Sequence, residues 1–220
     1  MPAETPTDTP LAVVRASAHI TTSWLGGVTT ELAIFPTSSS FQARDFVCRL
    51  STATVEQSGP FTVLPGYKRS LYLLEGDGME LQVQNPTEST TVRLTTPMQH
   101  VAFDGNATVT ATLLGGTVRD FNIIHQPSMP IHVQAMVLNR PTHEIFCPPQ
   151  PRDQRIYRLL LICVRGRVSL NYREHQIDLD TFDVLTPRLP AGTPSTLQVH
   201  ANAPDAAVLA ITVGLAKDNA

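Results

Sequence analysis

The sequence contains little charge, few cysteines and a single tryptophan. Of its 220 residues, 16% are Asp, Glu, Lys or Arg and 42% are hydrophobic. This composition is sufficient for a sizeable core but argues against long solvated helices. The formal net charge is -3, whereas nucleic-acid binding depends on clustered Lys and Arg. We therefore expect no nucleic-acid partner.

Signals for disulfides, membranes and secretion are also missing. Cys48, Cys147 and Cys163 are odd in number and form no C-x-x-C pair, so they indicate neither a disulfide framework nor a zinc site. No apolar run approaches the roughly 20 residues that span a bilayer. The N-terminus lacks the basic and apolar regions of a secretory signal. The sequence predicts a cytoplasmic protein that does not contact membranes.

The usual catalytic and cofactor motifs are absent as well. The seven histidines include no H-x-H pair, and no G-x-S-x-G elbow, Walker loop or helix-opening G-x-G-x-x-G is present. We expect no metal, no cofactor and no catalytic nucleophile.

Short β-branched runs make up most of the chain. They are separated by 18 prolines and 12 glycines, and sustained helical spacing of apolar residues is hardly seen. The fold predicted from this pattern is all-β with little helix. The expected strands lie at 45–55, 70–76, 79–84, 91–95, 107–114, 117–124, 156–172, 175–187, 195–201 and 206–215.

A weak internal repeat divides the chain in two. The stretches "LYLLEGDGMELQV" and "LLLICVRGRVSLNY" both lead an apolar strand through a glycine turn, at Gly76 and Gly166, into an alternating strand. The later stretch "IDLDTFDVLTPRLPAG" resembles the repeating unit of cupin barrels. We predict a duplicated cupin-like (bicupin) β-barrel or sandwich in one compact unit. Its expected parts are an N-terminal half at 9–125, a crossover at 126–150 and a C-terminal half at 151–216.

Polar residues alternate along two of the expected strands. Strand parity places Arg49 and Ser51 on one face, and it likewise pairs Asp120 with Asn122. On a barrel interior these side chains would form a cavity wall suited to a small polar ligand. The alternative is structural: Arg49 and Asp120 form an internal ion pair, or these residues lie at solvated edges.

Two adjacent cations precede the buried-looking run "SLYLLEG". An unpaired buried charge is costly. We therefore predict that Lys68 points to solvent and that Arg69 points inward, where an anion or Asp120 neutralises it.

Four stretches of the N-terminal half follow one another over residues 21–125, namely "TTSWLGGVTTELAIFP", "FVCRLSTATVEQSGPFTVLPGYKRSLYLLEGDG", "HVAFDG" and "GGTVRDFNIIH". Together they resemble the successive signatures of the HutD/Ves family. The resemblance implies a bacterial two-part cupin-like protein associated with histidine utilisation. The positions that it marks are Trp24, Gly26, Gly27, Thr29, Glu31, Arg49, Ser51, Glu56, Pro65, Gly66, Arg69, Asp120, Phe121 and Asn122.

From the parity and the resemblance together we predict a small-molecule-binding protein. Its ligand would be an acidic amino-acid derivative such as formylglutamate, and its role would be regulatory or accessory in histidine or amino-acid catabolism. Arg49 and Arg69 would each hold a carboxylate, while Asp120 and Asn122 would meet an amide. The predicted ligand-binding residues are Trp24, Arg49, Ser51, Glu56, Arg69, Asp120 and Asn122.

Two other functions remain open. One is a metal-free isomerase, epimerase or lyase that acts on a small acid or sugar, with Glu56, Asp120, Tyr67 or a histidine as acid and base. The other is a structural module that forms a homodimer through exposed sheet edges.

Overall fold

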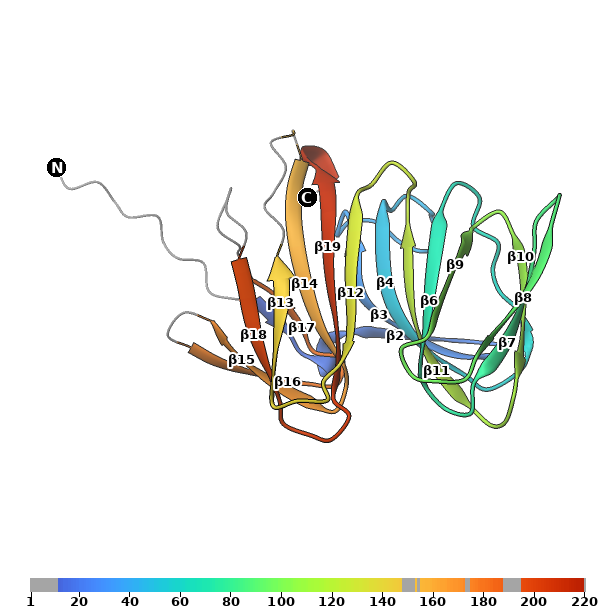
Figure 1. Cartoon of the computed structure of the whole chain (residues 1–220). Helices are drawn as coiled ribbons and strands as arrows, with labels where there is room; N and C mark the ends of the chain where they lie inside the picture. The colour runs from blue at the N-terminus through green and yellow to red at the C-terminus, as the bar shows by residue number, and fades with distance from the viewer. Residues whose placement is uncertain (1–11, 148–152, 154, 173–174, 188–194, 220) are drawn as a thin grey trace.

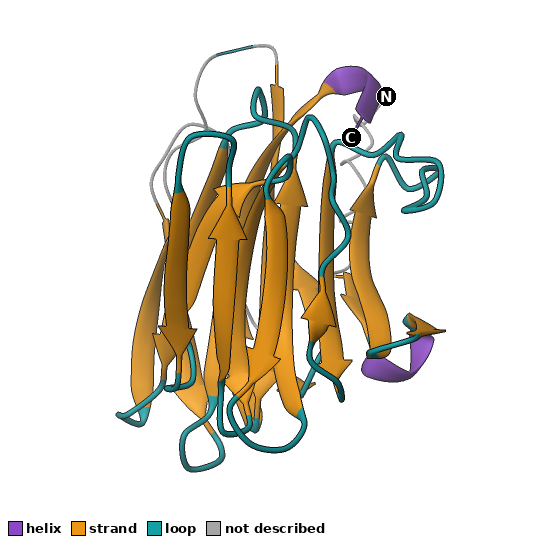
Figure 2. Ribbon diagram, turned by 90° about the vertical axis from the view of Figure 1, so that its right-hand side faces the viewer, coloured by secondary structure: helices purple, strands orange, loops and turns teal. Residues whose placement is uncertain are grey.

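The computed structural model describes residues 12–147, 153, 155–172, 175–187 and 195–219. Nearly all of this part of the chain is strand, as Figure 2 shows. The helices in it are two single 3-10 turns, η1 (Ala16–Ala18) and η2 (Lys217–Asn219). No helix within these ranges is both long and apolar enough to cross a membrane. The prediction of an all-β fold is confirmed.

The first half consists of two antiparallel sheets. The first inner sheet has, in spatial order, β2 (Ile20–Trp24), β3 (Gly27–Phe35), β4 (Cys48–Val55), β11 (Val118–His125), β6 (Lys68–Glu75) and β9 (His100–Asp104). The first outer sheet has β5 (Gly59–Pro60), β10 (Thr108–Leu113), β7 (Met79–Gln84) and β8 (Ser89–Leu94).

The second half repeats this arrangement. The second inner sheet has β1 (Ala12–Val14), β17 (Val184–Thr186), β14 (Arg155–Arg165), β19 (Ala207–Ala216) and β12 (Ile131–Val137). The second outer sheet has β13 (Thr142–Cys147), β18 (Ser195–Ala201), β15 (Arg167–Tyr172) and β16 (His175–Asp180).

The four sheets stack as four layers, with the two inner sheets in the middle (Figure 1). The stacking is explained by apolar side chains that each inner sheet carries on both faces. On β4, Cys48 and Leu50 face the second half, where Ile162 and Leu209 belong to the same core. The opposite face of the first inner sheet packs on the first outer sheet. The second inner and outer sheets share a third core.

The glycine turns confirm the duplication. Gly76 leads from β6 of an inner sheet to β7 of an outer sheet, and Gly166 leads from β14 to β15 in the same way. Both have positive φ, +96° and +75°, a conformation that glycine adopts without a Cβ clash. At Gly76 a Cβ would also lie 2.6 Å from the backbone oxygen of Thr117.

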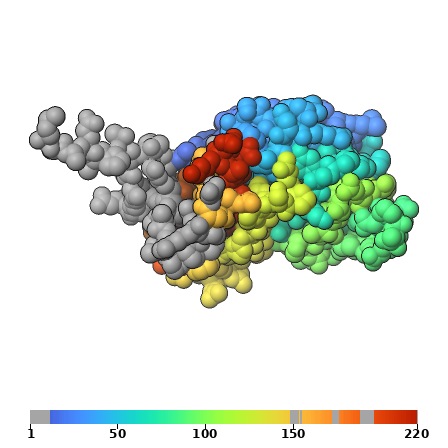
Figure 3. Space-filling view, turned by 90° about the horizontal axis from the view of Figure 1, so that it is seen from above, coloured from blue at the N-terminus to red at the C-terminus, as the bar shows by residue number. Residues whose placement is uncertain are grey.

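The division between the halves differs from the predicted one at two places. The segment 126–150, expected to be a crossover, contributes β12 and β13 to the second half. The short strand β1 precedes the whole first half but pairs with β17 of the second. The end of β19 and η2 line a surface hollow together with Val47 and Gln126. Seen from above, the C-terminal residues, in red, lie beside the first half, in blue (Figure 3).

Candidate functional site

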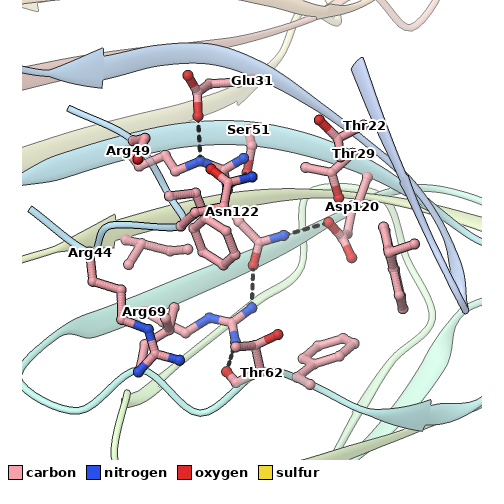
Figure 4. Close-up of a pocket in the computed structure, with 18 of the residues that line it drawn as sticks. Thr22, Thr29, Glu31, Arg44, Arg49, Ser51, Thr62, Arg69, Asp120 and Asn122 are labelled. Atoms are coloured by element: carbon pink, nitrogen blue, oxygen red, sulfur yellow. Dashed lines mark hydrogen bonds and ion pairs between the residues drawn. The ribbon is translucent and has the colours of Figure 1, made fainter. Parts of the chain in front are cut away.

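A cavity of about 600 Å³ lies in the first half, on the face of the inner sheet that looks toward the outer sheet. Strands β4, β6 and β11 form its floor, β2 and β3 form one side, and the loops at 36–47 and 56–67 complete the wall. Figure 4 shows the polar side chains that converge in it. The predicted parity holds, because Arg49, Ser51, Asp120 and Asn122 all line this cavity.

The sheet register places two arginines on either side of β11. Ile124 on β11 pairs with Arg49 on β4 and with Arg69 on β6. Neighbouring strands lie about 4.8 Å apart, so the backbones of the two arginines are about 10 Å apart. Their side chains therefore bracket the same part of the cavity.

Arg49 is neutralised by Glu31 of β3. Its Nε lies 2.7 Å from the Glu31 carboxylate, and Nη1 donates to the Ser51 hydroxyl at 3.2 Å. The guanidinium carbon lies 4.5 Å from the centroid of the Phe41 ring, within cation–π range. These contacts pair Arg49 with Glu31 and not with Asp120. The structural alternative, an ion pair between Arg49 and Asp120, is therefore wrong.

Arg69 is only 8% exposed, and two of its three guanidinium nitrogens have hydrogen-bond partners among the described residues. Its Nη2 donates to Asn122 Oδ1 at 2.9 Å, and Nη1 donates to the carbonyl oxygen of Thr62 at 3.2 Å. The rings of Phe61 and Phe103 lie 5.3 and 5.2 Å from the guanidinium carbon. Nε is buried and has no hydrogen-bond partner among the described residues. Burial lowers the pKa of Arg69 to about 10, so it remains a cation at neutral pH.

Asn122 connects Arg69 to a buried carboxyl group. Its Nδ2 donates to Asp120 Oδ1 at 2.6 Å, and Asp120 is 1% exposed. Burial raises the pKa of Asp120 to about 7, although the charge of Arg69 and hydrogen bonds from Ala53 N–H and Asn122 act in the opposite direction. Near neutral pH this carboxyl group therefore exchanges between an acceptor-only anion and a neutral acid that can also donate.

The other predicted residues are divided between the cavity and the surface. Trp24, 40% exposed, lines the mouth of the cavity. Glu56 is exposed just after β4 and is not among the lining residues. Lys68 points outward, as predicted, and its Nζ lies 2.7 Å from Asp104.

Several lining residues were missed by the sequence reasoning. Glu31 was marked by the family resemblance but was not predicted to bind ligand. Others come from the two loops, among them Phe41, Arg44, Phe61 and Thr62. The one usable signal was the presence of Phe41 and Phe61 in loops that are otherwise rich in small and polar residues.

No group of three or more His, Cys, Asp or Glu residues that could hold a metal ion occurs in the described ranges.

The pair Glu31–Arg49 should stabilise the fold. We expect Glu31→Gln to lower the free energy of unfolding by about 2 to 3 kcal/mol, because it leaves a mostly buried cation without its partner. A double-mutant cycle on Glu31 and Arg49 should give a coupling energy of about 1 to 3 kcal/mol in urea denaturation. The matched cycle on Arg49 and Asp120 should give a much smaller value. The reverse order would show that Asp120, not Glu31, is the partner of Arg49.

The fold and this cavity define a class, the duplicated cupin-like proteins. A Bacillus subtilis oxalate decarboxylase shares the fold, with a TM-score of 0.62 at 7% identity over 94% of this chain and 78% of that chain. Within the class, the chain belongs to the HutD family, whose sequence profile matches residues 16–207. This family is associated with histidine utilisation.

Relatives from Pseudomonas support this assignment. An uncharacterized 21.2 kDa protein in the hutC 3' region of Pseudomonas putida is 38% identical over 120 residues, which are 53% of this chain and 59% of that protein. The crystal structure of a conserved protein of unknown function from Pseudomonas aeruginosa PAO1 is 28% identical, with a TM-score of 0.75 over 93% of this chain and 99% of that one. HutD from Pseudomonas fluorescens SBW25 is 24% identical, with a TM-score of 0.67 over the same shares.

Proposed function

We propose that this protein binds a small carboxylate metabolite in the cavity of its first half, and that binding serves a regulatory or accessory role in amino-acid catabolism. The observation that carries the proposal is Arg69, a cation more than nine-tenths buried whose Nε–H lacks a partner among the described residues. A buried donor without a partner costs about 1 to 3 kcal/mol. A ligand carboxylate would remove this cost, since it accepts hydrogen bonds from guanidinium nitrogens.

The charge of the cavity supports an anionic ligand. Its described lining includes three arginines and two carboxyl groups. One of the two, Asp120, titrates near neutral pH. The lining is therefore positive by at least one charge, and buried positive charge attracts anions strongly because solvent screens it weakly.

The ligand class follows from the neighbours of Arg69. Phe61 and Phe41 provide apolar walls for a short carbon chain, while Asn122, Asp120 and Ser51 can meet an amide or hydroxyl group. An acidic amino-acid derivative such as formylglutamate has this combination of groups. The Pseudomonas putida relative in the hutC 3' region supports an intermediate of histidine degradation. Because Glu31 already forms an ion pair with Arg49, the first carboxylate of the ligand would bind Arg69.

The sole tryptophan of the chain offers a specific test. Because Trp24 lines the cavity mouth, binding should change its fluorescence. We expect formylglutamate or a related acid, at 100 times its Kd, to add about 2.7 kcal/mol to the free energy of unfolding. This would raise Tm by about 5 to 10 °C. If histidine-pathway acids and other small carboxylates change neither fluorescence nor Tm at millimolar concentration, the proposal is wrong.

One observation favours a second function, a metal-free enzyme. Asp120 has a pKa raised to about 7, in the range that suits a general acid or base. It would act on the bound acid by moving a proton. Incubation of the protein with each ligand in D₂O tests this, because a proton transfer at carbon would introduce deuterium detectable by NMR. An unlabelled, unchanged ligand supports the binding protein.

A further inference from the structure

The loop at 36–47 holds a third arginine at the cavity. This loop joins β3 to β4, and its position is fixed from two sides. The Tyr67 hydroxyl lies 2.8 Å from the carbonyl oxygen of Arg44 and 2.9 Å from that of Phe46. Within the loop, the backbone N–H of Ser40 donates to the Asp45 carboxylate at 2.9 Å. The backbone of Arg44 is thus held directly beside the start of β6, which carries Arg69.

Two features distinguish Arg44 from an ordinary surface arginine. Its φ is +56°, a left-handed conformation that is uncommon for residues other than glycine and costs of the order of 1 kcal/mol. Its guanidinium makes no hydrogen bond or ion pair with any other described residue, although it lines the cavity. Figure 4 shows the side chain on the side of the cavity where Arg69 and Thr62 lie.

Among the described residues, Arg44 has no carboxylate partner in the cavity. Glu31 neutralises Arg49, and Asp120 lies one hydrogen-bonded residue away from Arg69. A ligand whose single carboxylate binds Arg69 would leave Arg44, at the mouth, without an anionic partner. A ligand with a second anionic group could satisfy both arginines at once.

We propose that Arg44 is the second anion contact of this site, so that the cavity selects an elongated ligand with an anionic group at each end. This inference rests on the proposed function. One group lies on Arg69 at the floor, and the other lies on Arg44 at the mouth. The carbon chain between them passes Phe41 and Phe61. Arg44 is exposed, so its contact is weaker than that of Arg69 and acts mainly in discrimination between ligands.

Two acids of equal carbon number separate the roles of the arginines. Glutarate carries two carboxylates and pentanoate carries one. We expect the protein to bind glutarate about 5- to 10-fold more tightly, as measured by Trp24 fluorescence and calorimetry, since a partly exposed charge contact contributes about 1 kcal/mol. Arg44→Gln should remove this advantage and leave pentanoate binding within about 2-fold. Arg44→Lys should retain much of it.

Arg93→Gln is the matched control, because it removes the same charge from an exposed position on β8 of the first outer sheet. This variant should bind both glutarate and pentanoate as tightly as the wild type does. Equal binding of the two acids by the wild type, or equal weakening of both by Arg44→Gln, would overturn the role of Arg44 while the carboxylate site stands. If neither acid binds at millimolar concentration and no other carboxylate does, the proposed function fails together with this inference.

Discussion

Replacement of Arg69 by methionine should weaken the binding of a carboxylate ligand by about 10- to 150-fold. The reason is the loss of a charged hydrogen bond in a buried site, which is worth about 1.5 to 3 kcal/mol. Arg69→Lys keeps the charge but loses the planar fork of donors, so most of the affinity should be lost in this variant too. Fluorescence of Trp24 or isothermal calorimetry measures both effects.

The stability of the same variant should change far less. Methionine has a similar volume and carries no charge that must be desolvated, and such replacements of buried ions are often neutral or stabilising. Asp120 would then remain neutral, since it would no longer lie near a cation. We expect the free energy of unfolding near pH 6 to change by less than about 1.5 kcal/mol. Part of this change comes from Asn122 and the Thr62 carbonyl, which each lose a hydrogen-bond donor.

Arg158→Met provides the control for this experiment. The Nε of Arg158 is also buried without a partner among the described residues, but Arg158 lies on β14 of the second half. Its replacement should leave ligand affinity unchanged. If Arg69→Met unfolds the protein while Arg69→Lys binds as tightly as the wild type, Arg69 has a structural role and is not the anion contact.

The second large effect is a pH dependence that comes from Asp120. Its pKa in the folded protein is about 7, whereas an unperturbed aspartate has a pKa of about 3.9. The folded state therefore binds more protons than the unfolded state between these values. The associated stability is fully present below about pH 4 and is lost as the pH rises through 7. Between pH 5.5 and 8.5 this loss amounts to about 2 kcal/mol.

Asp120→Asn should abolish that part of the pH dependence. The variant should be close to the wild type in stability at pH 5.5 and about 2 kcal/mol more stable relative to it at pH 8.5, as measured by urea denaturation. Asp178→Asn, at an exposed carboxylate on β16, serves as the control and should follow the wild type. A wild-type stability that stays constant relative to Asp120→Asn between pH 5.5 and 8.5 would mean that Asp120 is ionised throughout this range.

The affinity for the ligand should also depend on the protonation of Asp120. Protonated Asp120 leaves Arg69 without a nearby negative charge, so a carboxylate that stays ionised should bind about 10-fold more tightly at pH 5.5 than at pH 8.5. In Asp120→Asn this dependence should be absent. Equal affinities of the wild type at both pH values would show that the ligand does not sense Asp120.

The sequence by itself determined many of the strands and which of their side chains share a face. The strands at 79–84 and 195–201 were predicted with the bounds that the structure has. Alternation is a local property of extended backbone, so it followed without knowledge of their neighbours that Asp120 and Asn122 share a face. Whether that face points inward was left open by the sequence. Strands β2, β3 and β9 were not among those predicted. Strands β12 and β13 were missed because the prolines around them were interpreted as a break.

Only the tertiary structure decided which charges meet. Asp120 and a ligand carboxylate were the partners expected for Arg49 from the sequence, whereas the register of β3 on β4 places Glu31 beside it. The loops that bring Phe41 and Arg44 to the cavity follow no periodicity, so their positions depend on contacts such as the Tyr67 hydroxyl. The pKa of Asp120 likewise depends on burial between two sheets. Alternation is set by each strand alone, whereas partner and depth are set by packing between distant segments.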